Sequence, residues 1–119
     1  TCSSASVDAN SPCDFSNREQ AERWGGWYLA GADPRRPDIS PLYADLSGLP
    51  PLLIQVGGAE MLHDEVVATA RRADEAGVEV TLEVWDDMFH IWHFAAVLLR
   101  EGADAIRHIG RFTRLHTLG

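Results

Sequence analysis

The sequence predicts an α/β protein built around a parallel strand–helix–strand unit, and three successive segments carry this prediction. Residues 52–56 form a short, nearly continuous apolar run, which is typical of a strand buried on both faces. Residues 61–76 place apolar side chains at helical spacing, and Gly77 is expected to end this helix. Residues 78–84 alternate apolar and polar side chains, as a half-exposed strand does. The crossover between the two strands is therefore expected to be right-handed.

The other segments predict helices and loops. Residues 1–13 are polar without an apolar period, which favours a loop or a frayed terminus. A helix is expected over residues 18–29, although two glycines within it each cost about 1 kcal/mol. After the second strand we expect a short apolar helix over 91–99, a break near Gly102, and a last helix over 103–115.

Length and charge narrow the class of protein. A chain of 119 residues and 13.1 kDa fits one domain. Its 10 Lys and Arg against 18 Asp and Glu give a net charge of −8, which argues against nucleic acid and anionic lipid as partners. No apolar run approaches the roughly 18 residues of a membrane span. Because no signal peptide is visible either, we expect a cytoplasmic protein.

The cysteines and histidines predict no metal or cofactor. Cys2 and Cys13 lie in a Ser-rich segment and predict neither a disulfide scaffold nor a zinc site. His90 and His93 are three residues apart, but no third ligand accompanies them. His93 is more simply explained as a neighbour of His90 on a short helix.

A carboxylate and an imidazole follow the two predicted strands. Glu60 lies just past the first strand, and His90 lies just past the second. Because the carboxyl ends of adjacent parallel strands meet at one rim of a sheet, we expect these two side chains to lie close together. A carboxylate facing an imidazole fixes its tautomer and stabilises the imidazolium during acyl transfer. Taken singly, each residue is more simply a solvated carboxylate or a structural histidine, but the pair favours an acid–base site.

Four short motifs occur in an order that resembles the C-terminal part of the hormone-sensitive-lipase family of α/β-hydrolases. They are S-P-L at 40–42, L-P-P at 49–51, acid-x-L-x-D-[DE] at 60–65 and G-M-x-H at 87–90. The last motif departs from the family because Asp87 replaces its glycine. The resemblance extends from about residue 33 to residue 115.

The resemblance implies the C-terminal portion of a three-layer α/β-hydrolase sandwich, with a cap-like segment and linker over 1–46 and a core over 47–119. It implies carboxylic-ester hydrolysis through a Ser-His-acid triad, with a small acyl ester as substrate. In that triad His90 is the base and Glu60 is the acid, where many members have Asp. Asp64 is the alternative acid, although at the start of a helix it also suits a capping role.

Five aromatic side chains are candidates for the substrate pocket: Trp24, Trp27, Tyr28, Phe89 and Trp92. By the resemblance, the first three lie where the family inserts its cap. There they either line an acyl pocket or pack the cap onto the core. The last two flank His90 and either border the pocket or anchor its loop.

The chain lacks the motifs that carry the family's nucleophile and oxyanion hole. Neither a G-x-S-x-G elbow nor an H-G-G-G loop occurs in it, so the chain alone is expected to be inactive. The alternative is an inactive fragment that serves as an interaction or dimerisation module. We also expect a homodimer or larger assembly through the edge strand 78–84, which acidic Glu79 and Glu83 on its outer face would oppose.

Overall fold

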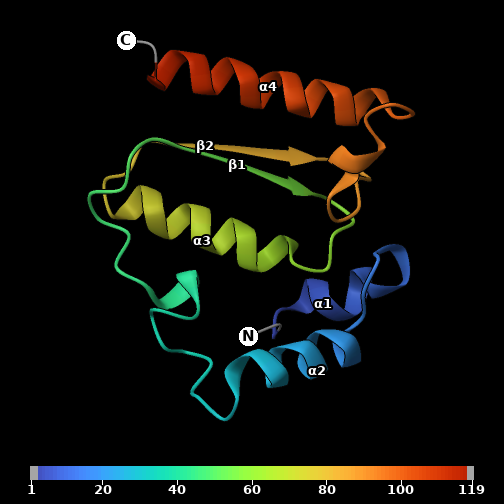
Figure 1. Ribbon diagram of the computed structural model, residues 1–119, viewed down its shortest axis with the longest axis vertical. Helices are drawn as coiled ribbons and strands as arrows, with labels where there is room; N and C mark the ends of the chain where they lie inside the picture. Colours follow the sequence, from blue (N-terminus) through green and yellow to red (C-terminus); the bar gives the residue numbers. More distant parts are fainter. Residues whose placement is uncertain (1–2, 118–119) are drawn as a thin grey trace.

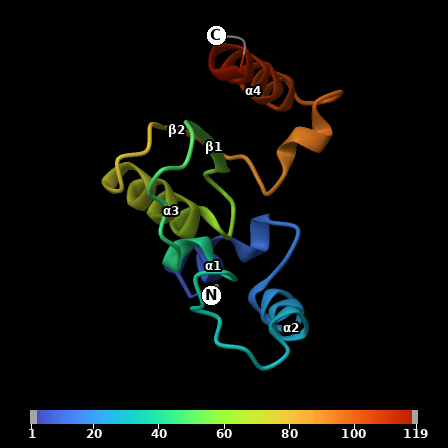
Figure 2. The same cartoon turned by 60° about the vertical axis from the view of Figure 1, so that its left-hand side comes forward.

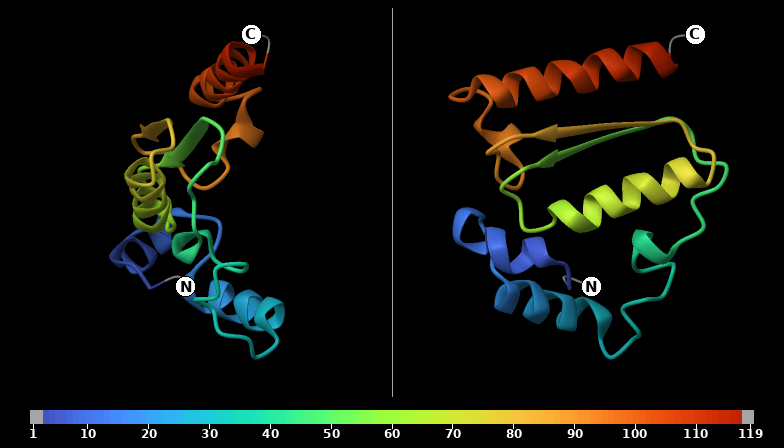
Figure 3. Two further views of the ribbon diagram at one scale, coloured as in Figure 1. Left: turned by 90° about the vertical axis from the view of Figure 1, so that its left-hand side faces the viewer. Right: turned by 180° about the vertical axis from the view of Figure 1, so that it is seen from behind.

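The computed structural model describes residues 3–117 and places two parallel strands between two long helices (Figure 1). Helix α3 packs on one face of the strands and helix α4 lies over the other, while the N-terminal helices lie beyond α3 (Figures 1 and 3). In chain order the elements are α1 (Ala5–Asn10), η1 (Ser11–Cys13), α2 (Arg18–Leu29), η2 (Pro41–Tyr43), β1 (Leu52–Gly57), α3 (His63–Glu75), β2 (Val80–Trp85), η3 (Trp92–Ala95) and α4 (Arg100–Thr117).

The predicted strand–helix–strand unit is confirmed. Strands β1 and β2 pair in parallel, in a register that runs from Leu52 opposite Val80 to Gly57 opposite Trp85. Strand β2 begins two residues later than predicted, because the chain first closes the end of α3. Gly77 adopts a φ of +83° there, and the Val78 amide donates to the Ala73 carbonyl at 3.0 Å. This is the hydrogen-bond pattern of a Schellman motif, which satisfies the last carbonyls of a helix.

A small core lies between α3 and the sheet. Ala73 and Val78 are buried there with Leu46, and Leu52 and Val80 pack against them. Arg72 of α3 also donates to the carbonyl groups of Leu42 in η2 and of Ala44 just after it, so η2 is held against the helix. The core therefore fixes β1 and β2 relative to α3 and sets the position of the loops at their carboxyl ends.

The N-terminal segment corrects the expectation of a loop over residues 1–13. Residues 5–13 form α1 and η1, while residues 1 and 2 lie outside the described part of the chain. Val7 is fully buried, and α1 contacts α3. A six-residue helix is too short to be stable alone, so its order comes from these tertiary contacts rather than from an apolar period. Cys13 is exposed and forms no disulfide, and Cys2 lies outside the described residues.

Helix α2 has the predicted bounds, Arg18 to Leu29. Asn17 caps it in a capping box with Gln20, in which each side chain accepts a hydrogen bond from the other's backbone amide. None of its residues is buried, and Figure 2 shows it standing away from the sheet.

The C-terminal region differs from the two helices that the sequence predicts. Residues 92–95 form a single 3-10 turn, and α4 runs from Arg100 through Gly102 without a break. A Cβ at Gly102 would approach the Trp92 carbonyl oxygen and the Ala96 Cα to 3.0 Å. The glycine therefore permits close packing of α4 on the turn, and it does not end a helix. Among the described residues, no helix combines the length and apolar character needed to cross a membrane.

Candidate active site

Glu60 and His90 meet at the rim where β1 and β2 end, as the sequence predicts. The Nδ1 atom of His90 lies 2.6 Å from Oε1 of Glu60. The Glu60 side chain is 6% exposed, whereas the His90 side chain is 41% exposed. The carboxylate is thus buried behind an imidazole that reaches solvent.

The second oxygen of Glu60 is also held. Its Oε2 accepts a hydrogen bond from the Gly57 amide at 3.0 Å. With one oxygen fixed by the backbone, the other presents a lone pair to Nδ1 of His90. This arrangement selects the tautomer with a proton on Nδ1 and a lone pair on Nε2. Within residues 3–117, Nε2 of His90 has no hydrogen-bond partner.

The loops that carry the pair lie in close contact. The Gly58 amide donates to the Trp85 carbonyl at 2.8 Å, and the Ala59 amide donates to the Met88 carbonyl at 3.0 Å. Any Cβ at Gly57 would collide with the Met88 carbonyl oxygen. Glycine at this position therefore allows the two loops to approach closely enough for the side chains to meet.

Two left-handed residues shape the loop around His90. Asp87 has a φ of +59°, and this is the position at which the sequence analysis noted Asp in place of the family's glycine. Aspartate tolerates this conformation better than most residues. Ile91 has a φ of +53°, which is strained for a β-branched side chain. The more strained of the two residues, Ile91, thus directly follows His90.

Asp14 joins the two loops, and the sequence analysis did not identify it. Its Oδ2 accepts from the Met61 amide at 2.8 Å, and its Oδ1 accepts from the His90 amide at 3.1 Å. Aspartate often caps a helix, but the cap of the following helix α2 is Asn17. No local pattern in the sequence indicates this role, because the two amides that Asp14 binds lie 47 and 76 residues away.

The structure places Asp64, the alternative acid, away from His90. Its carboxylate accepts hydrogen bonds from the Ser6 amide at 2.9 Å and faces Nδ1 of His63 at 3.1 Å. The contact with His63, followed by the Ser6 amide, lowers the pKa of Asp64 below its ordinary value. Asp64 therefore binds the N-terminal segment at the start of α3.

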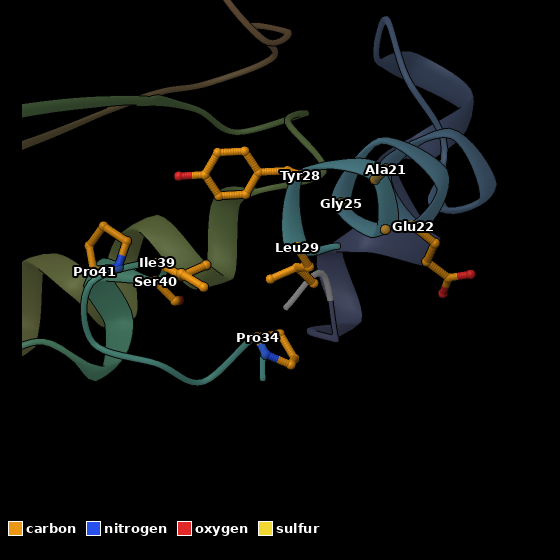
Figure 4. A pocket seen from close by; sticks show the side chains of 10 residues that line it. Ala21, Glu22, Gly25, Tyr28, Leu29, Pro34, Ile39, Ser40 and Pro41 are labelled. Carbon is orange, nitrogen blue, oxygen red and sulfur yellow. The ribbon is translucent and has the colours of Figure 1, made fainter. Parts of the chain in front are cut away.

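The three aromatic residues of α2 are exposed, and one of them borders a hollow. Trp24, Trp27 and Tyr28 are 48%, 72% and 75% exposed. A hollow of about 380 Å³ lies between α2 and residues 34–41, with Tyr28 and Leu29 on the helix side (Figure 4). None of its lining residues belongs to the loops that carry Glu60 and His90.

The two aromatic residues that flank His90 have different surroundings. Phe89 contacts Phe15 edge to face, with ring centroids 5.1 Å apart, and both border a shallow hollow of about 310 Å³. Trp92 is 1% exposed and packs against Trp85 and His93. Of the two roles expected for Trp92, its burial favours anchoring the loop.

His93 belongs to a separate polar chain beneath α4. Its Nε2 faces Oε1 of Gln55 at 2.8 Å, and the Gln55 amide donates to Glu83 at 2.8 Å. Glu83 in turn faces Nδ1 of His108 at 2.8 Å. Burial lowers the pKa of His93, and the nearby charge of Glu60 opposes this effect. His93 therefore forms a hydrogen bond with Gln55 of strand β1 and does not share a helix with His90.

The hydrogen bonds of Glu83 also correct the expectation of an acidic outer face on β2. The strand runs from Val80 to Trp85, and Glu83 faces α4 instead of open solvent. Only Glu79, which precedes the strand, remains exposed as expected.

Among the described residues, no group of three or more His, Cys, Asp or Glu side chains could hold a metal ion.

Comparison with known proteins identifies the fold family of the chain. Residues 1–94 match the family described as the alpha/beta hydrolase fold. The chain belongs to the α/β-hydrolase fold family. Over 100 residues it is 52% identical to an acetyl-hydrolase from Streptomyces hygroscopicus, a match that covers 84% of this chain and 32% of that protein. It is also 35% identical over 94 residues to a carboxylesterase/phospholipase from Mycobacterium tuberculosis, covering 74% of this chain and 25% of that protein.

Solved structures show to which branch of this fold family the chain is similar. An esterase from the bacterial hormone-sensitive lipase family superposes with a TM-score of 0.92 at 48% identity, over 97% of this chain and 39% of that one. A hormone-sensitive lipase from a metagenome library superposes with a TM-score of 0.92 at 33% identity, over 97% of this chain and 40% of that one. The chain is thus a hormone-sensitive-lipase-type α/β-hydrolase that spans between a quarter and a third of the length of its curated relatives.

Proposed function

We propose that this chain supplies the acid and the base of a carboxylic-ester hydrolase, with His90 as base and Glu60 as acid. The observation that carries the proposal is the 2.6 Å contact between Glu60 and Nδ1 of His90 at the carboxyl ends of β1 and β2. The names of the relatives, which include acetyl-hydrolase and carboxylesterase, support an ester as the substrate class. A small acyl ester is the substrate we propose.

The proposed mechanism uses the free nitrogen of His90. Nε2 takes the proton of a serine hydroxyl while the serine oxygen attacks the ester carbonyl carbon, and the same nitrogen then gives this proton to the leaving alcohol. Glu60 keeps the Nδ1 proton in place and stabilises the imidazolium. Water then attacks the carbonyl carbon of the acyl-serine while Nε2 takes a proton from the water. The bond from this carbon to the serine oxygen breaks, Nε2 returns the proton to the serine oxygen, and the carboxylic acid is released. The serine comes from the G-x-S-x-G elbow that the family resemblance implies, and this chain's sequence does not contain that motif.

A chimaera tests the proposal directly. In it, this chain replaces the matching third of the acetyl-hydrolase from Streptomyces hygroscopicus, which retains its own remaining two thirds. We expect the chimaera to hydrolyse a short-chain nitrophenyl ester and His90→Ala to lower its kcat about 10³-fold or more. The matched control is His63→Ala, which removes an imidazole that also faces a carboxylate. A folded chimaera without activity, or equal losses in both variants, would contradict the proposal.

An inactive interaction module is the second candidate, and the lack of a nucleophile motif in this chain favours it. In this second candidate function, the 119-residue chain associates with a second copy through one edge of β2. In the described residues β2 pairs with β1 along its other edge only. Light scattering at several concentrations tests this association. A compact monomer at high concentration would refute it, and an active chimaera would favour the hydrolase.

A further inference from the structure

We propose that Asp14 is a positioning residue for the Glu60–His90 pair, because its carboxylate binds one backbone amide from each of the two loops. The catalytic consequence rests on the proposed function, whereas the positioning itself rests on hydrogen bonds. Asp14 lies 46 residues before Glu60 and 76 before His90, so nothing local in the sequence brings these groups together.

The geometry uses both oxygens of the carboxylate. Oδ2 accepts from the amide of Met61, the residue after Glu60, at 2.8 Å. Oδ1 accepts from the amide of His90 itself at 3.1 Å. Apart from the pair itself, Asp14 is the one side chain in residues 3–117 that hydrogen-bonds to both loops. The two loops are thus bound by separate oxygens of one side chain, and Oδ1 also accepts from the Phe15 amide at 2.7 Å. A carboxylate provides two such acceptor oxygens, whereas an amide or a hydroxyl side chain provides one.

Neighbouring contacts hold Asp14 where it can act. The segment of residues 5–16, here called the N-terminal strap, runs along the Glu60 loop. The Asn10 side chain donates to the carbonyl oxygens of Gly58 and Glu60, at 3.2 and 2.9 Å. The buried Ser6 hydroxyl donates to the Met61 carbonyl at 2.8 Å. On the other side, Phe15 packs edge to face on Phe89, next to His90.

The loops need such a clamp because the His90 loop is strained. Left-handed Asp87 and Ile91 lie on either side of His90, and each such conformation persists only where surrounding contacts enforce it. Without the hydrogen bond to the His90 amide, this loop can relax and carry the imidazole away from Glu60. A displacement of about 1 Å in a catalytic group lowers a rate about 10²-fold. Asp14 would therefore affect turnover without contacting substrate.

Amide hydrogen exchange in the 119-residue chain tests the positioning without any assay of activity. We expect Asp14→Ala to speed exchange of the Met61 and His90 amides at least tenfold. Asp14→Asn keeps one acceptor oxygen, so it should protect one amide and release the other. Asp8→Ala is the matched control, because Asp8 lies in the same strap but pairs with Arg18. Unchanged exchange at both amides in Asp14→Ala would overturn the proposal, as would faster exchange spread evenly over the whole chain.

The active chimaera then tests the consequence for catalysis. We expect Asp14→Ala to lower kcat between 10- and 100-fold with KM within threefold, Asp14→Asn to recover part of the loss, and Asp8→Ala to match the parent. A kcat for Asp14→Ala within twofold of the parent would overturn the positioning role. If the chimaera is inactive with Asp14 intact, the proposed function fails, and the exchange of the two amides still decides whether Asp14 holds the loops.

Discussion

Within residues 3–117, two of the carboxylate–histidine pairs have nearly the same geometry but lie in very different places. Glu60 faces Nδ1 of His90 at 2.6 Å, and Glu83 faces Nδ1 of His108 at 2.8 Å. The first pair lies on loops past the ends of the strands, whereas the second lies between the middle of β2 and helix α4. The imidazoles are similarly open, at 41% and 36% exposure of their side chains.

The pairs differ in what holds each carboxylate. Backbone fixes Glu60, whose second oxygen accepts from the Gly57 amide, and the side chain is only 6% exposed. Side chains hold Glu83, whose second oxygen accepts from Gln55 and from the Trp85 indole, and its side chain is 25% exposed. A carboxylate–histidine contact alone therefore does not define a catalytic site. Its place at the strand ends and its backbone support distinguish the candidate acid–base pair from a link between sheet and helix.

Removing the charge from each carboxylate separates the two roles most strongly. In the active chimaera we expect Glu60→Gln to lower kcat about 10³-fold, because the amide no longer fixes the Nδ1 proton or stabilises the imidazolium. Glu83→Gln, the same change in the second pair, should leave kcat within threefold. Steady-state kinetics of the two variants measure this difference. Similar losses in both would mean that position at the strand ends is not what makes the first pair catalytic.

The second effect concerns stability and belongs to Glu83. Burial raises the pKa of Glu83, but hydrogen bonds from Gln55, His108 and Trp85 outweigh it and hold the pKa below the ordinary 4.5. This stabilisation is therefore present above pH 4.5 and is lost as the pH falls through the lowered pKa. We expect Glu83→Gln to lower the free energy of unfolding by about 1 kcal/mol at neutral pH.

Denaturant unfolding of the chimaera over a range of pH checks this expectation. The difference between the parent and Glu83→Gln should shrink as the solution is made more acidic than pH 4.5. A constant difference at every pH would show that the charge of Glu83 contributes nothing to folding.

The smallest effect concerns His93, which is linked to Glu83 through hydrogen bonds of Gln55. Its pKa lies below the ordinary 6.5, so the folded protein keeps it neutral while the unfolded chain takes up a proton. Stability is then complete above pH 6.5 and falls as the pH drops below it. His93→Gln retains an amide that can donate to Gln55 and does not titrate, so it should flatten this dependence. An unchanged slope between the parent and the variant, measured by thermal unfolding, would contradict the role assigned to burial.

Local patterns sufficed for the parts of the fold that carry the pair. The apolar run of β1, the period of α3 and the Gly77 stop predict the unit to within two residues, and parallel strands bring Glu60 and His90 to one rim. Because this step needs only strand order and direction, the sequence was enough for it.

Contacts between distant segments could not be read in the same way. Helix α1 and Asp14 depend on packing against loops that are 46 or more residues away, and no local period records such contacts. For Glu83, alternation along β2 predicts which side chains share a face but not that α4 covers that face. A glycine in a helical pattern is expected both where a helix breaks and where another segment packs closely on a helix. At Gly102 only the close approach of the Trp92 carbonyl oxygen shows that the second explanation holds.

The central claim is that Glu60 holds His90 with its proton on Nδ1 and its lone pair on Nε2. Nitrogen-15 and proton NMR of the histidine rings in the 119-residue chain measures this most directly. We predict that neutral His90 carries its proton on Nδ1, with a strongly downfield proton signal that Glu60→Gln removes and Glu83→Gln leaves in place. A neutral His90 with its proton on Nε2, or a signal that survives Glu60→Gln unchanged, would contradict it.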